Sequence, residues 1–173
     1  MIPHSLSRPE GRQIVAGSAQ GDILAIAQGI SFWGGIDPES GRIIDIHHPN
    51  HGQSVAGKVL LMPTSRGSCS GSGVLLQLAL DGNAPAALVF CEREEILTLG
   101  ALVASRIFGC PMPVLQVGRE AYARLAVAPH AALTEGRVSS EGESIPVVAA
   151  QISDLELTDR DRLVLGGRIS RNA

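Results

Sequence analysis

The chain has 173 residues, of which 45 % are hydrophobic and only 3 % aromatic, and its formal net charge is −3. This length and apolar content predict one domain with a sizeable core of Ala, Val, Leu and Ile side chains. The acidic balance argues against broad binding to nucleic acid or to an anionic membrane. No run reaches the roughly 18 apolar residues of a membrane span, and the N-terminus lacks the apolar core of a signal peptide, so we expect a cytoplasmic protein.

The three cysteines, Cys69, Cys91 and Cys110, are odd in number and widely spaced. They form neither a CxxC pair nor a disulfide framework, which predicts reduced thiols. At the N-terminus we expect a flexible leader over 1–11 and a strand over 12–16, followed by a further short element over 21–27.

Residues 29–38, GISFWGGIDP, contain the only Trp of the chain beside a Gly-Gly pair. The segment is either a strand that ends in a turn, with Trp33 as packing, or an edge that faces a ligand or a partner. The turn composition of 37–41 and the apolar character of 42–46 predict a hairpin over 30–46.

Three histidines follow, at His47, His48 and His51. Only Asp45 lies close enough in sequence to complete a ligand set, and Pro49 interrupts regular geometry. Zinc sites show more regular ligand spacing, so we expect no metal site here. A loop that places one His or Asn near the segment described next is the preferred interpretation.

The chain is organised around residues 59–80, VLLMPTSRGSCSGSGVLLQLAL. The apolar run 59–62 predicts a buried strand, which Pro63 ends, and 74–80 is typical of a buried helix. Between them, residues 64–73 contain three Gly, four Ser and one Arg. A strand, a Gly/Ser-rich loop and a helix in this order predict backbone N–H groups and a helix N-terminus that face an anion.

The residue types of this loop suit ligand binding better than a simple connection. Glycine permits positive φ and a close approach to the backbone. Arg66 offers a planar fork for a carboxylate or phosphate. One Ser would suffice as a helix N-cap, so four serines with an Arg favour a functional loop.

Alternating elements follow. We expect a strand over 86–91, an acidic stretch at 92–95 that favours the N-terminus of a helix over 96–107, a strand over 113–117 and a helix over 118–125. This order predicts a parallel α/β layer with right-handed crossovers. A hairpin arm over 133–146, a strand over 145–149, a solvated helical turn over 155–162 and a loose tail over 168–173 complete the chain.

Three mechanisms fit the central loop. Gly67-x-Cys69-x-Gly71 matches a nucleophile elbow, with Cys69 as the nucleophile of a thiol hydrolase and His130 as a base that lacks an obvious acidic partner. A phosphate cradle is the second, although the loop lacks the Gly-Lys-Ser/Thr ending. The third is a Ser general base beside Arg66, which would hold a carboxylate while backbone N–H groups stabilise the Ser anion.

Residues 48–59, HPNHGQSVAGKV, and 63–75, PTSRGSCSGSGVL, resemble the aconitase X small subunit, or swivel domain, and 29–41, GISFWGGIDPESG, fits the same family. The resemblance covers about residues 12–150. It implies an α/β fold of the swivelling β/β/α type, three-layered and equivalent to the mobile fourth domain of aconitase. We expect this domain over 12–167.

The resemblance also implies the site. The proton-accepting Ser of the family lies in a Gly-Ser-Thr-type motif, which matches Gly67-Ser68-Cys69, so Ser68 is the expected base. Aconitase itself has a Ser-Ser-Arg motif that aligns with Thr64-Ser65-Arg66 instead, which makes Ser65 the alternative, and Arg66 binds the carboxylate in either case. Further substrate contacts are expected from Ser65, Gly67, Cys69 and Ser70, with Trp33, His48 and His51 near the pocket.

Family members pair this domain with a large subunit that binds an iron–sulfur cluster on its own cysteines. The resemblance therefore implies a hydro-lyase that is active only with the large subunit, acts on a small carboxylate and binds no cofactor or metal on this chain. The Arg-Gly-Ser-Cys-Ser-Gly form is closer to bacterial cis-3-hydroxy-L-proline dehydratases, which form Δ1-pyrroline-2-carboxylate, than to archaeal mevalonate-5-phosphate dehydratases. A phosphomevalonate-type dehydratase subunit, a stand-alone Cys69 hydrolase and a non-catalytic anion-binding module are the alternatives.

Overall fold

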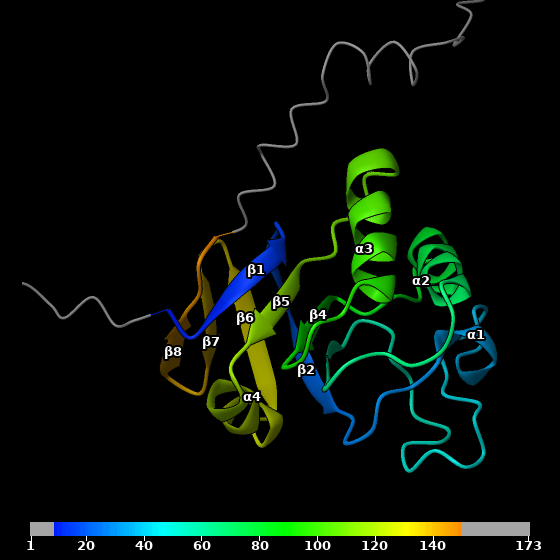
Figure 1. Ribbon diagram of the computed structural model, residues 1–173, viewed down its shortest axis with the longest axis horizontal. Coiled ribbons are helices and arrows are strands. Elements are labelled where there is room, and N and C mark those ends of the chain that lie inside the picture. Colours follow the sequence, from blue (N-terminus) through cyan, green and yellow to red (C-terminus); the bar gives the residue numbers. More distant parts are fainter. Residues whose placement is uncertain (1–8, 150–173) are drawn as a thin grey trace, which may run out of the picture.

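The structure is a computed structural model that describes residues 9–149 (Figure 1). Eight strands form one mixed sheet in the order β1-β5-β4-β3-β2-β6-β7-β8. The strands are β1 (Gly11–Val15), β2 (Ala19–Ala25), β3 (Val59–Met62), β4 (Ala87–Phe90), β5 (Val114–Val117), β6 (His130–Thr134), β7 (Arg137–Ser140) and β8 (Glu143–Pro146). The helices are α1 (Phe32–Gly35), α2 (Ser70–Leu80), α3 (Ile96–Ile107) and α4 (Arg119–Ala126).

The centre of the sheet is parallel, as predicted. Strands β2, β3, β4 and β5 are parallel neighbours, with Leu60 opposite Leu88 and Val89 opposite Leu115. All four residues of β3 and of β4 are buried. Continuous burial of this kind occurs because both faces of a parallel sheet are covered.

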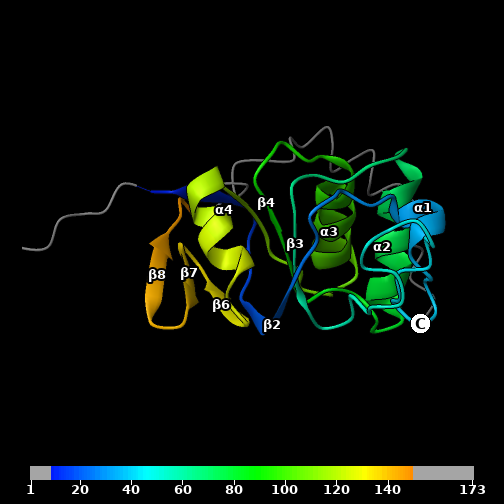
Figure 2. The same ribbon diagram turned by 90° about the horizontal axis from the view of Figure 1, so that it is seen from below.

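Alternate side chains of the central strands enter two different cores. On one face, Leu60 and Leu88 pack with residues of α2 and α3, such as Leu75 and Leu97. On the other face, Leu61 and its neighbours pack against α4 and against β6, β7 and β8. Figure 2 shows α1, α2 and α3 on one side of β3 and β4, and α4 with β6–β8 on the other. This arrangement confirms the predicted three-layered β/β/α fold.

Hydrogen bonds also close the sheet on itself. The Glu10 N–H donates to the Pro146 carbonyl, the Gln13 N–H donates to the Val148 carbonyl, and the Val148 N–H donates to the Gly11 carbonyl. These bonds pair β1 with the chain that follows β8, where the sequence predicted a strand over 145–149. Pairing β1 on this side removes an exposed strand edge, which would otherwise favour association with other chains.

The central helix begins at Ser70 rather than at Val74. Its first turn consists of Ser and Gly, which are weak helix formers, so tertiary packing decides its start. A side chain at Gly71 would contact Phe32 and Leu97, and a Cβ on Gly100 of α3 would lie 2.8 Å from the carbonyl oxygen of Ser72. Small residues therefore let α2 approach α1 and α3 closely.

The predicted hairpin over 30–46 is wrong. The segment forms α1 and irregular backbone, and its strand pairing is limited to an isolated bridge between Ile36 and Ile43. The turn at 37–41 is present, since the Gly41 N–H donates to the Asp37 carbonyl. Two bonds make this bridge, from the Asp37 N–H to the Arg42 carbonyl and from the Ile44 N–H to the Gly35 carbonyl. The Asp45 N–H then shares the Gly35 carbonyl, so the pairing does not continue as a strand ladder.

Strands β1 to β5 and helices α3 and α4 lie within a few residues of their predicted bounds. The hairpin arm predicted over 133–146 is a meander of three strands, β6, β7 and β8, and it begins at His130. Positions 1–8 of the expected leader, the helical turn over 155–162 and the tail over 168–173 lie outside the described residues. Within residues 9–149, no helix is long and apolar enough to cross a membrane.

Candidate functional site

The predicted loop lies at the carboxyl edge of the parallel sheet, between the segments that follow β2 and β4. The Arg66 N–H donates to the Ile30 carbonyl at 3.2 Å on one side. On the other side, the Glu92 N–H donates to the Pro63 carbonyl at 3.0 Å, and the Thr64 hydroxyl donates to the Arg93 carbonyl at 3.1 Å. In α/β folds, the loops that follow the carboxyl ends of parallel strands are a common place for ligand sites.

Two glycines allow the segments after β2 and β3 to touch. A Cβ on Gly29 would overlap the carbonyl oxygen of Thr64, so no larger residue fits there. Gly67 has φ +96°, and a Cβ there would overlap the Ser31 hydroxyl. The loop therefore turns sharply at Gly67, immediately before Ser68.

The loop presents a set of free hydrogen-bond donors. Within the described part of the chain, none of the backbone N–H groups from Gly67 to Ser70 donates to another residue. Helix α2 follows directly, and its N-cap, Cys69, makes no side-chain capping bond. Arg66 is exposed and forms no ion pair with any residue in 9–149. Amides, a helix N-terminus and a guanidinium are the groups that proteins use to bind anions, and this loop brings all three together.

The two candidate serines occupy different environments. Ser68 is exposed, and none of the hydrogen bonds among residues 9–149 uses its hydroxyl. The half-buried Ser65 donates to Glu94 Oε1 at 2.5 Å. A cavity of about 360 Å³ lies beside this contact, lined by Thr64, Ser65, Arg93, Glu94, Glu95 and Ile96.

The other predicted pocket residues differ in exposure: Trp33 and His51 are exposed, and His48 is buried. Trp33 lies in α1 beside the loop, because the Ser31 hydroxyl that contacts Gly67 donates to the Trp33 carbonyl at 2.9 Å. Its side chain is 66 % exposed. His51 is also exposed. These two side chains are open to a ligand or a partner.

The pocket role expected for His48 does not fit its surroundings. Its side chain is buried, with 7 % of its surface exposed. Nδ1 accepts from the Asn50 N–H at 3.1 Å, and Nε2 lies 3.2 Å from the Gln28 carbonyl. An amide can only donate, so the proton lies on Nε2 and both ring nitrogens are satisfied. His48 therefore anchors its loop to the segment after β2.

The three cysteines lie apart in the fold. Within residues 9–149, no group of three His, Cys, Asp or Glu side chains is placed to hold a metal ion. Cys69 is exposed before α2, Cys91 follows β4 and Cys110 follows α3. Burial, followed by the charge of Glu92, raises the pKa of the Cys91 thiol and makes it a poor ligand and nucleophile.

The candidate base for a Cys69 hydrolase lies at the wrong end of the sheet. His130 Nδ1 is 3.3 Å from Asp22 Oδ1, so His130 has an acidic partner that the sequence did not reveal. Asp22 also pairs with Lys58, which precedes β3, whereas Cys69 follows the carboxyl end of β3. A Cys–His pair with these residues is excluded by the fold.

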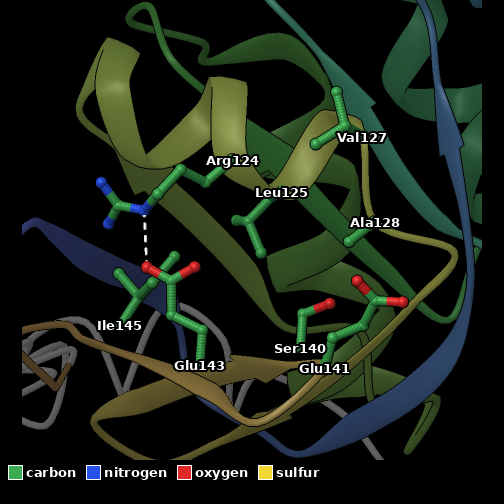
Figure 3. A pocket seen from close by; sticks show the side chains of 8 residues that line it. All are labelled: Arg124, Leu125, Val127, Ala128, Ser140, Glu141, Glu143 and Ile145. Carbon is green, nitrogen blue, oxygen red and sulfur yellow. Dashed lines mark ion pairs between the residues drawn. The ribbon is translucent and has the colours of Figure 1, made fainter.

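A second depression lies between α4 and strands β7 and β8, away from the predicted loop (Figure 3). It has a volume of about 290 Å³. Arg124 Nε lies 2.7 Å from Glu143 Oε1 at its edge, and the same guanidinium pairs with Glu10 at 2.5 Å. These contacts join α4 to the two chain segments that close the sheet. We interpret them as structural.

Sequence reasoning missed Glu94 as part of the site. The acidic stretch at 92–95 was expected to favour the helix N-terminus, and Glu94 does bind the first turn of α3. Its contact with Ser65 joins residues 29 positions apart. Only the pairing of β3 with β4 brings these two loops together.

Fold and loop together define a β/β/α domain that presents an exposed Gly/Ser loop with free N–H groups at the carboxyl edge of its parallel strands. A family model for the aconitase X swivel domain matches residues 8–142. The chain therefore belongs to the aconitase X swivel-domain family.

Relatives of known name agree with this assignment. A cis-3-hydroxy-L-proline dehydratase of Pseudomonas aeruginosa is 45 % identical over 148 residues, which cover 86 % of this chain and 25 % of that enzyme. A phosphomevalonate dehydratase small subunit of Methanothermobacter thermautotrophicus is 45 % identical over 101 residues, covering 58 % of this chain and 74 % of that subunit. The crystal structure of holo aconitase X from Thermococcus kodakaraensis matches with a TM-score of 0.62 and 30 % identity, covering 80 % of this chain and 96 % of that chain.

The chain spans only part of its longer relatives. It corresponds to 25 % of the P. aeruginosa dehydratase and to 30 % of the dehydratase of the same name from Hypocrea jecorina. The phosphomevalonate dehydratase relatives are named small subunits and are matched over most of their length.

Proposed function

We propose that this chain is the small subunit of an aconitase-like hydro-lyase, in which it binds the substrate carboxylate and supplies the general base. One observation supports this proposal above the others. The free N–H groups from Gly67 to Ser70, the unpaired Arg66 guanidinium and the free Ser68 hydroxyl belong to one short loop within the described residues 9–149. A dehydration that begins with removal of a proton next to a carboxylate requires these three functions.

In the proposed reaction, Arg66 and backbone N–H groups bind the carboxylate and Ser68 removes the proton from the adjacent carbon. The electrons of that C–H bond form a C=C bond as the C–O bond of the neighbouring hydroxyl breaks. The departing oxygen takes a proton from solvent and leaves as water, and Ser68 loses the abstracted proton to solvent, which restores its deprotonated oxygen. With cis-3-hydroxy-L-proline, the resulting enamine tautomerises to Δ1-pyrroline-2-carboxylate.

Electrostatics favours Ser68 over Ser65 as the base. A serine oxygen must become negative to accept a proton, so it needs donors and positive charge around it. Ser68 lies among unpaired amides at the N-terminus of α2. Ser65 instead donates to the Glu94 carboxylate, whose charge opposes a second negative charge 2.5 Å away. Ser65 is better suited to hold the loop in place.

A partner is part of the proposal. The loop is exposed in this chain, so a second protein surface must cover the substrate and exclude water. We propose a large subunit for this role, and we assign the iron–sulfur cluster to it because the described residues offer no ligand set. The small-subunit names of the archaeal relatives and the unmatched three quarters of the P. aeruginosa enzyme support this division.

The substrate that we propose is cis-3-hydroxy-L-proline. The match to the P. aeruginosa dehydratase covers 86 % of this chain, whereas the match to the phosphomevalonate dehydratase small subunit covers 58 % at the same identity. Three free cysteines suit a reducing compartment, so we place the enzyme in the cytoplasm.

Replacement of single hydroxyl groups tests the proposal. In the complex with the large subunit, Ser68→Ala should lower kcat by about 10²–10⁴-fold, the range for loss of a general base. Ser65→Ala should cost less, roughly tenfold to hundredfold, because it removes the contact to Glu94 and leaves the base in place. A Ser68→Ala complex with near-normal turnover refutes the assignment. A carboxylate that binds this chain without any turnover in the complex would indicate an anion-binding module instead.

A further inference from the structure

The Glu94 carboxylate connects two structural elements. Its Oε1 accepts from the Leu97 N–H at 2.8 Å, and its Oε2 accepts from the N–H and the hydroxyl of Thr98, both at 2.9 Å. Oε1 also accepts from the Ser65 hydroxyl at 2.5 Å. One half-buried side chain thus binds the first turn of α3 and the loop after β3.

Capping of α3 alone does not explain this arrangement. Glu95 is the N-cap residue of α3, but its side chain pairs with Arg93 and makes no capping bond. Glu94, one residue earlier, reaches over it to the amides of Leu97 and Thr98, which satisfies the donors that an N-cap side chain normally binds. The Ser65 bond adds nothing to this cap. It ties α3 to the loop.

The Ser65 bond is also the last in a series that holds this loop against the segment after β4. Pro63 and Thr64 are held by main-chain groups of Glu92 and Arg93. Ser65 is the third contact, and the chain becomes exposed from Arg66 to Ser70. Ser65 therefore fixes the loop on the β4 side, immediately before Arg66, whose N–H binds the Ile30 carbonyl on the β2 side.

We propose that Glu94 is a positioning residue, which holds the catalytic loop through Ser65 so that Arg66 and Ser68 face the substrate. This inference rests on the proposed function for its effect on turnover, but the ordering of the loop does not. The first test therefore measures the loop in the full-length chain without any substrate.

Limited digestion with trypsin reports on the loop directly, because trypsin cleaves after Arg66. Hydrogen bonds to charged groups are strong enough that losing one should increase cleavage after Arg66 by roughly tenfold or more. Cleavage after the exposed Arg119, at the start of α4, provides an internal reference for global unfolding. Ser65→Ala is the decisive variant, because it removes the loop contact and leaves the cap of α3 intact.

Glu94→Ala and Glu94→Gln should both increase cleavage after Arg66 relative to cleavage after Arg119. The neighbouring carboxylate variant Glu95→Gln is the matched control and should leave the ratio unchanged. The double variant Ser65→Ala/Glu94→Ala should show nearly the same cleavage ratio as either single variant, because both substitutions remove the same contact.

The second test uses the complex with the large subunit. Ser65→Ala and Glu94→Gln should each lower kcat by roughly tenfold to hundredfold, the effect of a misplaced reacting group, with a smaller change in KM. Glu95→Gln should match the wild type.

The two tests separate the possible errors. An unchanged cleavage ratio in Ser65→Ala overturns the positioning role, whatever the activity. Faster cleavage in Ser65→Ala with unaltered kcat shows that the loop contact exists but does not serve catalysis. That result also overturns the positioning role. Loss of turnover beyond roughly a thousandfold in Ser65→Ala, with the loop still protected, contradicts Ser68 as the base and hence the proposed function.

Discussion

Substitution of Gly67 by Ala tests the loop geometry without requiring a partner. Gly67 has φ +96°, a conformation that costs an L-residue about 1–2 kcal/mol. The added methyl would also overlap the Ser31 hydroxyl and would lie 3.0 Å from Ser31 Cβ. We expect the free energy of unfolding to fall by about 2 kcal/mol. For a chain of this size, Tm should fall by about 4–8 °C in a thermal melt.

A second glycine on the C-terminal side of the loop provides the control. Gly73 lies inside α2 and is exposed, and a Cβ added there would have no atom within 4 Å beyond the backbone of its own helix. Gly73→Ala should raise the stability by about 1 kcal/mol, because Ala is the better helix former. Ser31→Ala should restore part of the loss in Gly67→Ala. Equal melting temperatures for Gly67→Ala and the wild type would refute the geometry described for this loop.

Three further predictions concern residues outside the loop. Burial raises the pKa of Tyr122 to about 12, and the nearby Cys91 thiol adds to this. The protonated phenol is favoured in the fold, so its contribution to stability is complete below the unfolded pKa of about 10 and is lost as the pH rises towards 12. Tyr122 is the only Tyr, so the ultraviolet absorbance of tyrosinate should titrate above about pH 10 in the folded chain, and a midpoint near 10 would contradict its burial. The exposed Trp33 is the only Trp, and we expect the large subunit to cover it. Its fluorescence should then shift to shorter wavelength when the large subunit binds, and an unchanged spectrum would show that Trp33 lies outside the interface. Arg124→Ala should lower Tm by breaking the pairs with Glu10 and Glu143, with a smaller effect at high salt, and equal Tm values at low salt would show that these pairs do not stabilise the fold.

Much of the fold could be predicted because local signals agree with the tertiary structure. The apolar runs that form β3 and β4 and the acidic stretch before α3 are local signals for these elements. The start of α2 could not be found this way, because Ser70 and Gly71 have weak helix propensity and are fixed by contacts with α1 and α3. Closure of the sheet depends on pairing between Gly11 and Val148, which local patterns do not encode.

The candidate site was predictable in its loop and not in its surroundings. The strand, the Gly/Ser segment and Arg66 are neighbours in the sequence, so they lie close together whatever the tertiary structure. The contact between Ser65 and Glu94, by contrast, depends on two neighbouring strands. His48 was expected near the pocket because its loop was expected to place a His or Asn near the Gly/Ser loop, but its burial against the carbonyl of Gln28 is a tertiary property.

The most direct test of the account is an affinity purification of this chain from its native cells, followed by a dehydration assay with cis-3-hydroxy-L-proline. We predict a brown partner subunit and formation of Δ1-pyrroline-2-carboxylate only when both proteins are present. Phosphomevalonate as the sole substrate of that complex would correct the substrate and keep the mechanism. Recovery of the chain without a partner, with no dehydration of either compound, would contradict the central claim.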